Sequence, residues 1–158
     1  MSLDELKALY EPAPPELVEF VDRGMANFLH AMNTGETEDW ITLFAEDVEL
    51  TSITAAAEGT TYRGHEALQR YNGRVREAFE YTNIDVEEVL VASDSVFVQL
   101  GRWQGRGRGS GIEVDSEWAA ANERNEDRLM QWAHAYTSHE QALRVGLERA
   151  GRGAELAD

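Results

Sequence analysis

The feature that most constrains the fold of this chain is the pattern of its second half. After Tyr81, four β-rich runs follow one another, and short turn-forming segments separate them. Because short turns leave no room for a crossover connection, neighbouring runs are expected to pair as an antiparallel sheet. The runs are NIDVEEVLVAS, SVFVQLGRWQ, IEVDSEWAAANE and RLMQWAHAYT.

The first half is predicted to be mainly helical. Apolar residues recur at steps of three and four from Leu17 to Met32, which is the period of one buried helix face, and Asn33-Thr34-Gly35 is expected to end this helix. The pattern as a whole predicts an α+β fold, with three helices before most of the sheet and one helix after it. The expected helices lie at about residues 15–34, 37–47, 65–80 and 138–150, and a short strand lies at 48–53.

One domain is expected, because 158 residues can bury a sizeable core without disulfides or a structural metal, and the chain has no cysteine. Residues 1–14, which end in a proline-rich segment, are predicted to form an N-terminal arm. Residues 15–150 are predicted to form the domain, and residues 151–158 a polar C-terminal tail.

The charge of the chain argues against several classes of partner. Its 30 acidic and 14 basic residues give a formal net charge of -16, which repels phosphate backbones and anionic lipid surfaces. Nucleic acid and membrane are therefore not expected partners. The first residues carry acids where a signal peptide needs a basic start and an apolar run, and we predict a cytoplasmic protein.

Several stretches of the sequence resemble the nuclear-transport-factor-2-like superfamily. They are FLHAMNTGETEDWITLFAEDVEL, TYRGHEALQRY, VEEVLVASDSVFVQLGRWQGRGRGSGIEVDSEWA and DRLMQWAHAYTSHEQAL. The chain is most similar to the SnoaL-like branch of polyketide cyclases and ketosteroid-isomerase relatives, over about residues 20–147. The resemblance implies a cone-shaped, curved antiparallel sheet packed against helices, an apolar pocket inside the cone, and a homodimer.

The working residues of two related families are missing at the matching positions. Ketosteroid isomerases use a tyrosine and two aspartates, and the matching positions here hold Phe28, Ala119 and Ser52, none of which can take those roles. Limonene-epoxide-hydrolase relatives use an arginine and an aspartate on the third strand, where this chain has Leu100 and Arg102.

The SnoaL-type cyclases use one acid/base side chain on the last strand, and the resemblance places His134 there. A histidine has an ordinary pKa of about 6.5, which suits general-base work near neutral pH. Arg102 is the candidate electrostatic partner. The alternatives are a neutral His134 that only lines a pocket, and an Arg102 that is exposed or paired with an acid such as Glu117.

Alternation along the last strand, with the face set by the resemblance, predicts that His134 points into the pocket together with its neighbours at two-residue spacing. Trp118, Ala120 and Asn122 are expected on the opposite sheet face, where a second copy of the chain would cover them. No H-x-H or H-E-x-x-H spacing occurs, so no metal site is expected. No other cofactor is predicted. The predicted pocket residues are Phe28, Met32, Trp40, Ser52, Leu100, Ala119, Trp132 and Tyr136.

Two functions remain open at this point. The first is a cofactor-independent cyclase, isomerase or lyase that moves a proton on a compact or polycyclic hydrophobic substrate, with His134 as base. The second is a non-catalytic ligand-binding or dimerisation domain that has lost the acid/base residues of the family.

Overall fold

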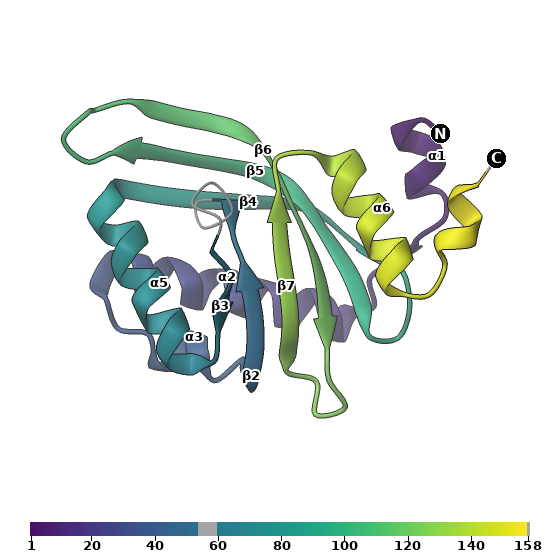
Figure 1. Ribbon diagram of the computed structural model, residues 1–158, viewed down its shortest axis with the longest axis horizontal. Helices are drawn as coiled ribbons and strands as arrows, with labels where there is room; N and C mark the ends of the chain where they lie inside the picture. The colour runs from purple at the N-terminus through teal and green to yellow at the C-terminus, as the bar shows by residue number, and fades with distance from the viewer. Residues whose placement is uncertain (54–59, 158) are drawn as a thin grey trace.

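The computed structural model describes residues 1–53 and 60–157. A curved seven-stranded sheet in the order β1-β4-β5-β6-β7-β2-β3 separates two groups of helices (Figure 1). This architecture confirms the predicted α+β class. The strands are β1 (Glu11–Pro12), β2 (Phe44–Thr51), β3 (Tyr62–Arg63), β4 (Phe79–Val91), β5 (Val96–Gly107), β6 (Glu113–Arg124) and β7 (Met130–Tyr136). The helices are α1 (Leu3–Lys7), α2 (Pro15–Thr34), α3 (Glu38–Ile41), α5 (His65–Ala78), α6 (His139–Arg149) and the 3-10 helix η1 (Gly153–Leu156).

The predicted antiparallel meander is present. Strands β4, β5, β6 and β7 pair in sequence order, and each pair is antiparallel. The sheet continues beyond the meander because β2 pairs with β7 in parallel and β3 pairs with β2. A fold in which early and late strands meet in one sheet explains why residues from both halves of the chain surround a common interior.

Helix α2 has the boundaries that the sequence predicts. Pro15 stands at its first position, where a missing N–H costs nothing, and Gly35 closes it with a left-handed φ of 80°. Its buried side chains follow the expected apolar stripe. They include Leu17, Val21, Phe28 and Met32.

Two element boundaries differ from the prediction. The helix expected over residues 37–47 ends at Ile41, and β2 begins at Phe44. The spacing of apolar residues there fits a helix as well as a strand. The residues from Phe44 onward form a strand because they pair with β7. Phe79, expected on a helix, is the first residue of β4, where its ring packs edge-on against Trp103 at 5.4 Å.

The sheet has a buried core on each face. The inner core lies between the concave face and helices α2, α3 and α5. The outer core lies on the other face, under α6 and α1, and contains Val98, Leu143 and Leu147. Both faces of the central strands are therefore buried within one chain.

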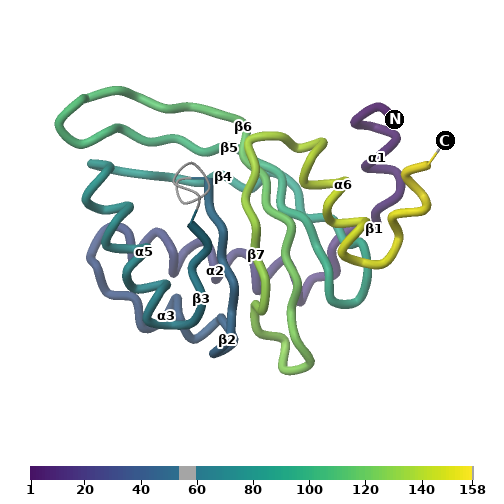
Figure 2. The backbone as a smooth tube through the Cα atoms, viewed as in Figure 1, coloured from purple at the N-terminus to yellow at the C-terminus, as the bar shows by residue number. Residues whose placement is uncertain are grey.

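Residues 1–14 and 151–157 pack onto the rest of the chain and against each other (Figure 2). The hydroxyl of Tyr10 donates a hydrogen bond of 2.5 Å to the carbonyl of Leu143 in α6. Arg152 donates to the carbonyls of Leu9 and Ala92 at 2.8 and 2.9 Å. The two ends thus complete the cover of the outer face. Among the residues described, no helix is long and apolar enough to cross a membrane.

Candidate functional site

A cavity of about 90 Å³ lies inside the cone, between the concave sheet face and the helices. Side chains from α2, α3, α5 and five strands surround it. None of the described lining residues carries a charge. The lining consists of Met25, Phe28, Trp40, Phe44, Leu50, Ser52, Tyr71, Ile84, Gln99, Trp118, Ala120, Asn122, Met130, Ala133 and Ala135.

The space exists because small residues face large ones across the interior. Ala120 on β6 and Ala133 and Ala135 on β7 form part of the sheet wall. Opposite them the ring of Trp40 packs edge-on against Phe28, with ring centroids 5.6 Å apart. Interlocked aromatic rings cannot move independently into the gap, so the volume left by the alanines stays open.

Among the described lining residues, four polar side chains interrupt the apolar surface. Burial raises the pKa of Tyr71 to about 12, although a hydrogen bond with Ser52 works in the opposite direction. Tyr71 is therefore a neutral hydrogen-bonding group at ordinary pH. On the sheet wall, Asn122 donates from Nδ2 to Oε1 of Gln99 at 3.1 Å. These groups can orient a ligand through hydrogen bonds but bring no charge to it.

The prediction that Trp132, His134 and Tyr136 face the cavity is wrong. On β7, Ala133 and Ala135 line the cavity, as does Met130 at the start of the strand. Trp132 and Tyr136 pack against the outer core, which places His134 between them on the outer face. There the guanidinium of Arg149, from α6, lies 4.3 Å from the Trp132 ring centroid. The ring of His134 stacks on that of Tyr136 at 4.5 Å. His134 cannot act on a molecule in the cavity.

The same inversion applies to the neighbouring strands. Leu100 and Ala119, predicted to line the pocket, are buried in the outer core beneath α6. Conversely, Trp118, Ala120 and Asn122 were expected on the outer face and instead line the cavity. These three residues therefore need no second chain as cover. The homodimer itself stays a prediction.

The remaining predicted residues fall into two groups. Phe28, Trp40 and Ser52 line the cavity, whereas Met32 belongs to the inner core and lines a separate hollow of about 110 Å³. Arg102 lies in step with Leu100 and forms an ion pair of 2.8 Å with Asp115, its side chain 47% exposed. Arg102 is not among the described residues that line the cavity, and no described polar contact joins it to His134.

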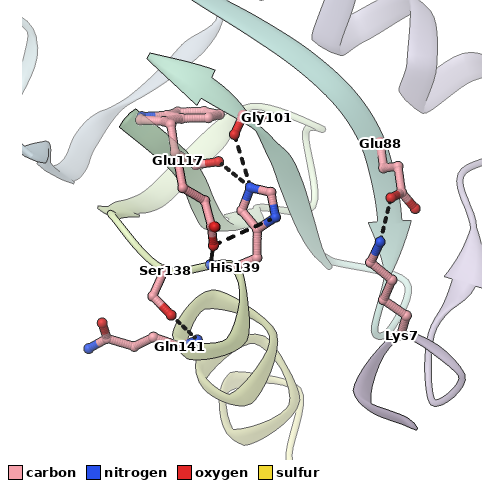
Figure 3. Close-up of polar contacts among 8 residues, drawn as sticks. Lys7, Glu88, Gly101, Glu117, Ser138, His139 and Gln141 are labelled. Carbon is pink, nitrogen blue, oxygen red and sulfur yellow. Dashed lines mark hydrogen bonds and ion pairs between the residues drawn. The ribbon is translucent and has the colours of Figure 1, made fainter. Parts of the chain in front are cut away.

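Helix α6 is fixed to the outer face by polar contacts around its first turn (Figure 3). The Nε2 atom of His139 lies 2.9 Å from the carbonyl of Gly101 and 3.0 Å from that of Trp118. Its backbone N–H donates to Glu117, and Ser138 caps the helix through Gln141. This histidine has a structural role. Within residues 1–53 and 60–157, no three histidine, aspartate or glutamate side chains gather as metal ligands.

The comparison with protein families agrees with this architecture. A sequence model of the SnoaL-like domain matches residues 25–143, which is more than half of the chain. The chain therefore belongs to the SnoaL-like domain family. Comparison with curated protein sequences gave no match.

Solved structures with the same fold include proteins named for binding or catalysis. One is a hypothetical protein from Catenulispora acidiphila DSM 44928 with a ketosteroid isomerase-like fold, in complex with trimethylamine (TM-score 0.62, 17% identity, 90% of this chain and 98% of that chain). A second is a putative SnoaL-like polyketide cyclase from Shewanella denitrificans OS-217 (0.60, 13%, 86% and 99%). A third is TerC, co-crystallized with polyporic acid (0.64, 13%, 83% and 97%). At these identities the likeness shows the fold alone.

Proposed function

We propose that this chain binds a compact, uncharged and mainly apolar molecule in the cavity of the cone. The observation that carries the proposal is the composition of the lining, in which apolar and aromatic side chains surround a few neutral polar groups. Pockets for small molecules generally have this make-up. The complexes of trimethylamine and polyporic acid with two proteins of this fold support small-molecule binding as its use.

Size and charge narrow the ligand class. The cavity of about 90 Å³ is smaller than typical ligand pockets of roughly 300–1,000 Å³, which favours a molecule of about one ring over a polycyclic one. A charged ligand would lose its hydration without meeting an opposite charge in the lining. The net charge of -16 further disfavours anions.

Binding is favoured over proton-transfer catalysis because none of the described lining residues is a general base. Such catalysis needs a side chain that titrates near the operating pH and can reach the substrate. Tyr71, with its pKa raised to about 12 by burial, can donate a hydrogen bond but does not accept a proton from carbon at neutral pH. His134 lies on the other side of the sheet.

The proposal can be tested with toluene and cyclohexane as probes, by thermal unfolding and by protein-observed NMR titration. At a concentration ten times the dissociation constant, a probe should stabilise the chain by about 1.4 kcal/mol. Filling the cavity with Ala135→Leu should abolish binding. His134→Ala, one residue away but on the outer face, should bind as the wild type does.

Two outcomes would contradict this proposal. One is the absence of binding by both probes, and the other is wild-type binding in Ala135→Leu. Turnover of a cyclic ketone that disappears in His134→Ala would instead revive the catalytic function.

A further inference from the structure

We propose that Gln99 and Asn122 form a recognition pair that selects, among compact neutral molecules, those carrying a hydrogen-bond acceptor beside a donor, as in a lactam. This inference rests on the proposed ligand-binding function and adds the chemical class of the ligand. The two side chains lie on the central strands β5 and β6, deep in the sheet wall of the cavity.

Both amides are almost completely buried. Gln99 is 4% exposed and Asn122 is 1% exposed. Since Gln99 pairs with Ala120 and Asn122 pairs with Phe97, the two side chains stand diagonally on the same face of the β5–β6 ladder. A buried amide is costly unless its polar atoms find partners. Two of them side by side in an apolar wall therefore need an explanation.

The surroundings fix the orientation of each amide. The Nδ2 atom of Asn122 lies 3.2 Å from the carbonyl oxygen of Ala120 and 3.5 Å from that of Phe97. Because both neighbours are acceptors, the nitrogen of Asn122 must face them. The atom of Gln99 that meets Nδ2 at 3.1 Å must then be its oxygen. The Nε2 group of Gln99 then points away from Asn122 Nδ2.

Two polar atoms of this pair have no partner in the described part of the chain. They are Oδ1 of Asn122, an acceptor, and Nε2 of Gln99, a donor. Neither is sealed off, because Ser116 Oγ is the one fully enclosed unpaired side-chain atom among residues 1–53 and 60–157. Both residues line the cavity, where a ligand can reach them, and Gln99 also lines a neighbouring hollow of about 50 Å³.

The pair thus offers one donor and one acceptor from side chains that are already joined by a hydrogen bond. A ligand that carries an acceptor for Gln99 and a donor for Asn122 satisfies both, while its apolar part meets the aromatic wall. A secondary lactam has this pattern within one small ring. A net hydrogen bond contributes about 0.5–1.5 kcal/mol, so each contact should be worth about twofold to tenfold in affinity.

Three probes of similar size separate the two contacts. Toluene offers neither group, cyclohexanone offers an acceptor only, and 2-piperidone offers an acceptor and a donor. Dissociation constants from NMR titration should show 2-piperidone binding about twofold to tenfold more tightly than cyclohexanone. Gln99→Met, which keeps the length of the side chain, should weaken both polar probes relative to toluene. Asn122→Leu should weaken 2-piperidone alone.

Gln131→Met is a matched control. Gln131 lies on β7 outside the cavity lining, where its amide donates to Asp47 at 3.1 Å, so this variant should keep the wild-type preference. The inference is overturned if wild type binds 2-piperidone no better than cyclohexanone, or if Gln99→Met leaves both polar probes unchanged. The Gln99→Met comparison stands by itself if Asn122→Leu does not fold. Failure of all three probes to bind would reject the proposed function as well.

Discussion

Replacing Gly146 by alanine should destabilise the protein, although the same change in most helices is favourable. Gly146 lies inside α6, where alanine has the higher helix propensity by about 0.5–1 kcal/mol. A Cβ at this position, however, would collide with Oη of Tyr10 and would lie 2.7 Å from Cγ2 of Val98. The helix packs this closely on β5 only because residue 146 has no side chain.

The size of the effect follows from the contacts that must give way. Overpacking a buried interface costs about 1–3 kcal/mol. Displacing Tyr10 also weakens its hydrogen bond to Leu143, a further 0.5–1.5 kcal/mol or so. After subtraction of the gain in helix propensity, Gly146→Ala should lower the free energy of unfolding by about 2 kcal/mol. Urea denaturation followed by circular dichroism measures this quantity.

Gly73→Ala is the matched control, because a Cβ at Gly73 in α5 meets nothing within 4 Å. It should raise the free energy of unfolding by about 0.5–1 kcal/mol. In a Tyr10→Phe background, Gly146→Ala should cost less, since the closest atom is gone. The reasoning is refuted if Gly146→Ala and Gly73→Ala stabilise the protein equally.

Three further predictions concern charge, ionisation and packing. The pKa of Glu16 is lowered by its hydrogen bond to Arg124, so the stability that the carboxylate adds should be present above its ordinary pKa of about 4.3 and vanish at lower pH. Urea denaturation should show Glu16→Gln to be less stable than wild type by at most about 1 kcal/mol at neutral pH and equal to it in acid. Burial raises the pKa of Tyr71 to about 12, so the free energy of unfolding of the wild type should fall by about 1 kcal/mol at about pH 11, whereas that of Tyr71→Phe should not. Denaturation at a series of pH values measures this difference, and an equal fall in both proteins would contradict the prediction. Leu147→Ala, at a side chain with no exposure, should cost about 2–5 kcal/mol in the same assay, and a loss below 1 kcal/mol or so would mean that α6 packs more loosely than described.

The sequence predicts the element types and the meander well because both depend on local periodicity. The stripe from Leu17 to Met32 has one period only, and turn-forming residues separate the strands. The boundaries of elements are harder to predict where the same residues fit both a helix pattern and a strand pattern. Phe44 lies at helical spacing from Trp40 and also at the start of a strand, and its assignment depends on β7, far away in the sequence.

The cavity face could not be read from alternation, because alternation divides a strand into two faces without saying which one meets the helices. Here both faces are buried, so hydrophobicity does not distinguish them. On β7, Trp132 and Tyr136 are large and look suited to a pocket, yet they fill space under α6. Ala133 and Ala135 are small, and their smallness leaves the cavity open. These two alanines are the feature of the sequence that marks the cavity face of β7.

The order in which the chain is synthesised leaves the outer core uncovered for a time. Val98 and Leu100 are in place once β5 has formed, but α6, which covers them, follows β5, β6 and β7 in the chain. Until then the emerging chain presents a bare apolar sheet face, which is a typical substrate for chaperones and a route to aggregation. Tyr10, which is made before α6, has its hydrogen-bond partner 133 residues further along the chain. A truncation that removes α6 should therefore lower the soluble yield even though every residue of the cavity is present.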